Sequence, residues 1–213
     1  MINVEQNFEI FINEITQNVH REGIDKLIAW LKAKDTKIAP ASTKYHLACE
    51  GGLVEHSLNV YNTLKKLLRC HYGPVVADAN GEMCDPIPYT SETIAIVALL
   101  HDISKVNYYT ISERNTKDEN GNWIKVPFYQ VKEAENRLIF GSHSMNSFYM
   151  ISKFIKLDYE EELAILHHMG GLDVTEDTLT VKNTTEAWIK SPLALLLHQA
   201  DMQATFLIES NNE

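Results

Sequence analysis

The chain has 213 residues, of which 45% are hydrophobic and 23% are charged, and these ordinary globular proportions exclude a disordered chain, a collagen-like repeat and a coiled-coil rod. Its 19 Lys and Arg residues stand against 29 Asp and Glu residues, and the resulting net charge of -10 would repel the phosphates of a nucleic-acid duplex. Small anionic substrates remain compatible with this charge if a metal ion or a few basic side chains receive them.

The N-terminal region is predicted to contain two amphipathic helices. Apolar residues recur at helical spacing over residues 8–19 and again over residues 24–31, after Gly23. Residues 35–52 contain Pro and a Gly pair and are expected to form an irregular connection. A third helix is predicted from residue 53, with His56 on the flank of its inward face.

The next predicted helix is the most hydrophobic in the chain. Residues 70–88 lack periodicity and are expected to form a loop, after which Ser91 and Glu92 favour a helix start. The run 94–100 is apolar on all sides, which is typical of a central, buried helix. His101 and Asp102 follow that run directly, so we expect the core to present them to a cleft.

A β-hairpin is predicted after this helix. Residues 108–111 and 123–126 have strand character, and Asn120-Gly121 between them is a strong hairpin turn signal. Aromatic side chains gather in the same region, and packing within the hairpin is the favoured interpretation over stacking on a nucleotide base. They are Tyr108, Trp123, Phe128 and Tyr129.

The C-terminal half is expected to be helical again, with one polar interruption. A helix is predicted over residues 143–154, and Asp158 with Glu161 forms a plausible capping box for another that ends near His168. Residues 170–190 are expected to form a loop that could cover a cleft. Ser191-Pro192 begins a last helix that extends to about residue 208 and carries Asp201 on its inward face.

Polar residues interrupt several of these apolar helix faces. Imidazole and carboxylate groups are ligands for Mn, Fe, Co, Ni and Zn, and helical domains build metal sites from side chains on facing helices. Six such ligands would suit two ions, with Asp102 bridging. Helical spacing alone does not choose between His167 and His168. The candidate ligands are His56, His101, Asp102, His143, His167 or His168, and Asp201.

This pattern resembles the H…HD…H…H…D pattern of HD-domain metal-dependent phosphohydrolases. The context matches as well, since residues 51–58 read GGLVEHSL and Lys105 follows the His-Asp pair. Residues 39–46 look like the corresponding stretch of small HD hydrolases from bacteria and phages, and the resemblance covers residues 20–208. It implies an all-α, HD-domain-like helical bundle with a small β-hairpin insertion.

The resemblance also implies how the ligands divide. His56, His101, Asp102 and Asp201 would hold one divalent transition metal ion, and Asp102, His143 and His168 the second. His168 is preferred to His167 because it precedes Met169-Gly170-Gly171 as the motif histidine of the small hydrolases does. The sequence after the His pair lacks the Gly-Tyr-Pro of the cyclic-di-GMP phosphodiesterases, which argues against that substrate.

The expected function is hydrolysis of a nucleotide or another small phosphate ester by metal-activated water. Asp102 would orient the water, Lys105 is a candidate for contacting a phosphate oxygen, and Arg137 is a weaker candidate of the same kind. Two alternatives remain open: a diiron oxygenase built on the same ligands, and a nucleotide-binding regulatory module without turnover. No duplex nucleic-acid partner is expected.

No linker-like segment divides the chain, so one domain is predicted over residues 1–213, with N-terminal helices in 1–34 and the metal-site core in 53–208. The first ten residues lack the pattern of a secretory signal, and the longest apolar run is too short to span a bilayer. Three widely spaced Cys residues without a C-x-x-C pair favour reduced thiols. We therefore expect a cytoplasmic protein without membrane association.

Overall fold

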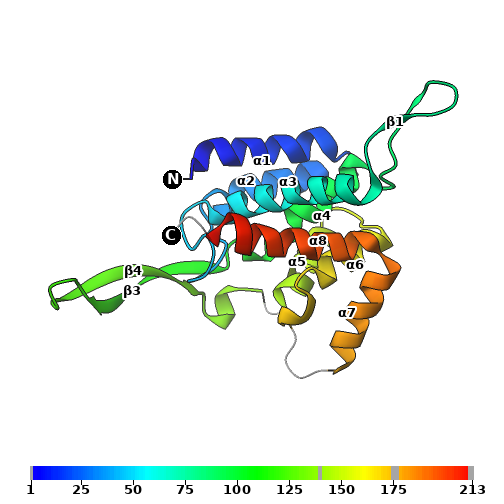
Figure 1. Ribbon diagram of the computed structural model, residues 1–213. Helices are drawn as coiled ribbons and strands as arrows, with labels where there is room; N and C mark the ends of the chain where they lie inside the picture. The colour runs from blue at the N-terminus through cyan, green and yellow to red at the C-terminus, as the bar shows by residue number, and fades with distance from the viewer. Residues whose placement is uncertain (1, 139–140, 174–177, 211–213) are drawn as a thin grey trace.

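The computed structural model describes residues 2–138, 141–173 and 178–210, and it shows a helical bundle with two hairpins (Figure 1). The α-helices are α1 (Val4–Asn18), α2 (Ile24–Ala33), α3 (Gly52–Tyr72), α4 (Ser91–Leu100), α5 (His143–Ser152), α6 (Tyr159–His167), α7 (Thr178–Lys190) and α8 (Pro192–Gln203). The strands are β1 (Val76–Ala77), β2 (Met83–Cys84), β3 (Tyr109–Lys117) and β4 (Trp123–Val131). Short 3-10 turns occupy Asp35–Lys37, Ile103–Lys105, Ala134–Asn136 and Gly170–Asp173, and a π-turn, Ala204–Ile208, continues α8. The predicted fold class is confirmed.

Helix α4 lies at the centre of the bundle, as its apolar sequence predicts. All of its residues from Thr93 to Leu100 are buried, and it packs against α1, α3 and α6. Helix α3 packs in turn against α1 and α8, and these three helices lie alongside one another (Figure 1). The residues that follow α4 are therefore delivered into the interior of the bundle.

Capping residues determine where two of the outer helices begin, and one buried ion pair ties the turn before α2 to α6. The capping box is present, with Asp158 and Glu161 each accepting from the other's backbone N–H. Ser191 and Pro192 stand at the N-cap and first turn of α8 as predicted. The guanidinium of Arg21, in the turn before α2, donates two hydrogen bonds of 2.5 and 2.7 Å to the fully buried carboxylate of Glu161.

Strands β3 and β4 form a ribbon that projects from the helices (Figure 1). The prediction that the aromatic side chains pack within this hairpin is wrong for Trp123, whose exposed fraction is 70%. The aliphatic side chain of Ile111 in the same ribbon is also exposed, at 63%. The physical reason is that a two-stranded ribbon without a covering layer has no interior in which to bury them. The expected loop over residues 70–88 carries a second, shorter hairpin, β1–β2.

The segment expected to be a loop, either covering a cleft or lying on the surface, is mostly helical. Residues 178–190 form α7, which packs on α6 and α8, and Trp188 in it stacks on His198 with the ring centroids 4.9 Å apart. Tertiary packing stabilises this helix although its own sequence is polar, which is why periodicity did not reveal it. The part of the expected loop at residues 174–177 lies outside the described residues. Among the described residues, no helix is both long enough and apolar enough to cross a bilayer.

Candidate metal centre

The structure brings the predicted ligands together in one buried cluster. His56 comes from α3, and His101 and Asp102 come from the end of α4. His143 begins α5, and His168 caps the C-terminal end of α6. Asp201 comes from α8. The side chain of His143 is 25% exposed, whereas His101 and His168 are fully buried.

One half of the cluster surrounds the Nε2 atom of His56. This atom lies 3.2 Å from Asp201 Oδ1, 3.3 Å from His101 Nε2 and 3.6 Å from Asp102 Oδ2. His101 Nε2 lies 3.5 Å from the same Asp102 oxygen. The ligand atoms of His56, His101 and Asp102 all lie within 4.8 Å of one another, a spacing that one metal ion can span.

The other half of the cluster faces the second oxygen of Asp102. Asp102 Oδ1 lies 3.5 Å from His143 Nε2 and 3.6 Å from His168 Nε2. Asp102 Oδ1 and His168 Nε2 are buried and make no hydrogen bond with any described residue. Unsatisfied buried polar atoms are costly, so two that face each other fit a cation-binding site. The two oxygens of one carboxylate thus point to two different groups of imidazoles.

Two of the imidazoles are held by their own helix ends. His101 Nδ1 donates to the carbonyl of Ala98 at 2.8 Å, and His168 Nδ1 donates to that of Ile165 at 2.7 Å. Because a carbonyl oxygen only accepts, Nδ1 carries a proton in both rings, and each ring turns its Nε2 toward the cluster. A hydrogen bond from the ring nitrogen that does not bind the metal is the usual way in which proteins orient a metal-binding histidine.

The structure separates His168 from His167, which spacing could not do. The Nδ1 atom of His167 lies 3.0 Å from the Thr184 hydroxyl of α7, whereas His168 is grouped with Asp102 and His143. His168 is therefore the residue in position to bind a metal. His198, beside it, donates from Nδ1 to the backbone carbonyl of His168 at 2.6 Å and supports that turn.

Charges in the cluster keep its carboxylates ionised. Burial alone would raise the pKa of Asp102, but the Lys105 ammonium, 2.6 Å from Oδ2, and the nearby imidazoles hold it well below its usual range. Burial likewise opposes ionisation of Asp201, yet the adjacent His56 lowers its pKa. Burial lowers the pKa of His101 to about 3, so this ring is neutral. Although burial opposes it, neighbouring carboxylates raise the pKa of His56 to about 10 and also raise the pKa of His168, so metal binding would release protons from these two rings.

The cluster forms part of the lining of a cavity of about 1460 Å³. The start of α1, the loop around residues 44–50 and the chain from Met202 to Ser210 form its other walls. Lys105 also lines this cavity, as the sequence predicts for a phosphate-binding residue. Arg137 does not line it: its Nε donates to the Lys132 carbonyl at 3.0 Å and its guanidinium lies over the Tyr108 ring. The structure therefore does not bring Arg137 to the site.

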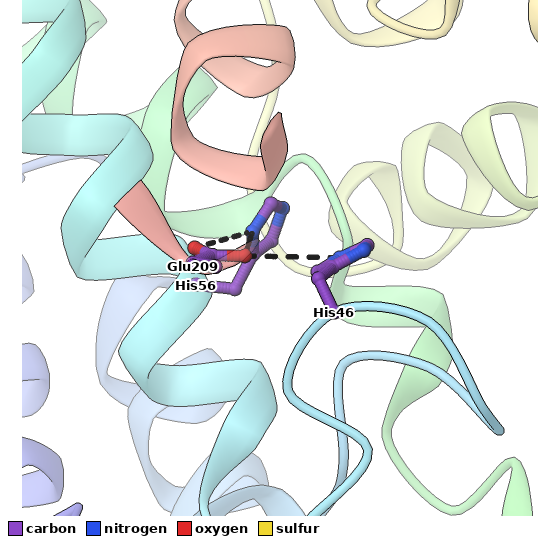
Figure 2. A group of neighbouring side chains, drawn as sticks. All are labelled: His46, His56 and Glu209. Atoms are coloured by element: carbon purple, nitrogen blue, oxygen red, sulfur yellow. Dashed lines mark hydrogen bonds and ion pairs between the residues drawn. The ribbon is translucent and has the colours of Figure 1, made fainter. Parts of the chain in front are cut away.

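Sequence reasoning missed two residues at the cluster, His46 and Glu209 (Figure 2). Both carboxylate oxygens of Glu209 lie 3.1 Å from His56 Nδ1, on the side of the ring away from Asp102. His46 approaches from the loop before α3, with Nε2 4.0 Å from Glu209 Oε2. Helical spacing gives no signal for Glu209, because a regular helix would turn it away from the direction of Asp201, and the irregular loop gives none for His46.

Comparison with known protein families gives a match over most of the chain. The family model described as the HD domain matches residues 53–202, a range that contains all six residues of the cluster but neither His46 nor Glu209. Searches of curated proteins and of solved structures found no match.

Proposed function

This chain belongs to the HD-domain family, and on that premise we propose that it is a metal-dependent phosphohydrolase acting on a nucleotide or another small phosphate ester. One observation carries the proposal: the two oxygens of Asp102 face two separate groups of imidazoles, at 3.5 to 3.6 Å from the nearest nitrogens. A carboxylate so placed can bridge a pair of divalent ions, which is an arrangement suited to hydrolysing phosphate esters.

In this proposal each half of the cluster would hold one metal ion. His56, His101, Asp102 and Asp201 would hold one ion, and Asp102, His143 and His168 would hold the other. Ions in these positions would lower the pKa of a bound water and neutralise charge on the phosphoryl oxygens. Their identity is left open among Mn, Fe, Co, Ni and Zn, because imidazole and carboxylate ligands accept each of them.

The remaining side chains would bind and orient the ester. Lys105 lines the cavity with its ammonium beside Asp102, so it is in place to donate a hydrogen bond to a phosphoryl oxygen. His143 is the most exposed imidazole of the cluster and lines the same cavity, as does Asp201 of the other half, so both halves would face a bound ester. The cavity volume of about 1460 Å³ is ample for a nucleotide.

The proposal is tested by measuring phosphate release from a panel of nucleotides and simple phosphate esters. The protein is stripped of metal with a chelator and reloaded anaerobically with manganese or iron. We expect release from the reloaded protein and none from the stripped protein. Tight nucleotide binding without product under any metal would instead indicate a regulatory module, and iron-dependent oxygen consumption with a small alcohol or phosphonate would indicate an oxygenase. Either result would overturn the proposed hydrolysis.

A further inference from the structure

His56 differs from the other buried imidazoles of the cluster in what holds it. His101 and His168 donate from Nδ1 to carbonyls at the ends of their own helices. His56 lies inside α3, where the neighbouring carbonyls already accept helix hydrogen bonds. Its Nδ1 instead meets both oxygens of Glu209 at 3.1 Å, and Glu209 lies 153 residues further along the chain.

Glu209 is itself fixed in place. Its carboxylate is buried, and the Asn59 side chain, one turn after His56 on α3, donates to Oε1 at 3.0 Å. Its backbone N–H donates to the Ala204 carbonyl at 3.0 Å, which closes the π-turn that follows α8. Asn59 thus holds the carboxylate, and the π-turn holds the backbone of the same residue.

The π-turn explains how Glu209 reaches His56 from the same side as Asp201. Eight residues of regular α-helix would rotate Glu209 by about 80° away from the direction of Asp201. A π-turn inserts the equivalent of one extra residue, so the net rotation falls to about 20°. Asp201 therefore meets Nε2 of the His56 ring at 3.2 Å and Glu209 meets Nδ1 of the same ring.

We propose that Glu209 is a positioning residue of the metal centre, which holds the Nδ1 proton of His56 so that Nε2 is directed at the ion. This inference rests on the proposed metal centre and deepens it. A carboxylate acceptor fixes the orientation of the ring and increases the electron density on the metal-binding nitrogen more than a carbonyl does. The half of the cluster around His56 thereby depends on the π-turn that follows α8.

The test compares Co²⁺ binding to the full-length wild type, Glu209→Gln and Glu161→Gln. The amide introduced by Glu209→Gln would keep the shape and one acceptor oxygen but lose the charge. The Glu161 substitution is a matched control, because it also neutralises a buried carboxylate but one that pairs with Arg21, away from the cluster. Affinity is measured by competition with a chromophoric chelator, and the ligand-field absorption of bound Co²⁺ is recorded together with the thermal unfolding of the metal-free proteins.

We expect Glu209→Gln to weaken binding of one Co²⁺ by about 10- to 100-fold and to shift its absorption bands. The Glu161 variant should lose thermal stability without loss of affinity. Unchanged affinity in the Glu209 variant, or an equal loss in both variants, would overturn the inference. A wild type that binds no Co²⁺ would overturn the metal centre as well, whereas a binding wild type with an unaffected Glu209 variant would overturn only the role of Glu209.

If Glu209→Gln does not fold, a second variant tests whether Glu209 positions His56 for metal binding. Asn59→Ala removes the side-chain N–H that holds Glu209 Oε1 but keeps the carboxylate itself. We expect a smaller loss of Co²⁺ affinity in the same direction. Wild-type affinity in that variant would contradict the inference.

Discussion

Replacing Asp102 by Asn is expected to reduce metal-dependent phosphate release by about a thousandfold or more. Among the described residues, Asp102 is the one carboxylate that faces both halves of the cluster, and an amide cannot bridge two cations as an ionised carboxylate does. Metal ions supply several kcal/mol of charge stabilisation in such reactions, and each 1.4 kcal/mol is a factor of about ten in rate. The measurement is the rate of phosphate release with saturating Mn²⁺ and substrate.

Two controls make this result specific. Asp25→Asn neutralises an exposed carboxylate in the first turn of α2 and should retain full activity. The Asp102→Asn substitution also leaves the Lys105 ammonium without its carboxylate partner at 2.6 Å, so far-ultraviolet circular dichroism must show that the variant is folded. Normal turnover by a folded Asp102→Asn protein would contradict the proposed mechanism.

Replacing Arg21 by Met is expected to lower the free energy of unfolding by about 3 kcal/mol. The substitution leaves the carboxylate of Glu161 fully buried, and among the described residues the backbone N–H of Asp158, at 3.0 Å, is the one donor that remains to it. Loss of one partner from a buried ion pair is strongly destabilising because the other charge is left uncompensated. Urea unfolding of the metal-free protein measures the change without a contribution from bound metal.

The matched control is Arg69→Met. Arg69 also forms a two-point pair, with Asp85, but the two side chains are 39% and 49% exposed. Exposed pairs contribute at most about 1 kcal/mol, so this variant should unfold close to the wild type. Equal effects at the two sites would contradict the assigned role of the Arg21–Glu161 pair.

Much of the fold follows from local patterns in the sequence. The apolar run before His101 predicted a buried central helix, and α4 has that position. The Asp158 capping box and the Ser191-Pro192 helix start also have their predicted geometry. These features depend on neighbouring residues alone, which is why they could be interpreted without a structure. Helix α7 depends on contacts with α6 and α8, and its sequence therefore suggested a loop.

The candidate site was predictable where a polar residue interrupts an apolar helix face. His56 and Asp201 have that signature, and both lie in the cluster. His167 and His168 are adjacent at a helix end, so helical spacing does not distinguish them, whereas in the structure His168 faces Asp102 and His167 faces Thr184 of α7. Glu209 reaches the cluster through a π-turn, which a search for α-helical spacing does not anticipate.

The metal content of the purified protein decides whether the cluster around Asp102 holds two ions. Elemental analysis is made on protein prepared without chelator, reloaded anaerobically with Mn²⁺ or Fe²⁺ and freed of excess metal. We expect two ions per chain for the wild type and for His167→Ala, and one ion for His168→Ala. A wild type that holds a single ion or none, or a loss of metal in His167→Ala but not in His168→Ala, would contradict this expectation.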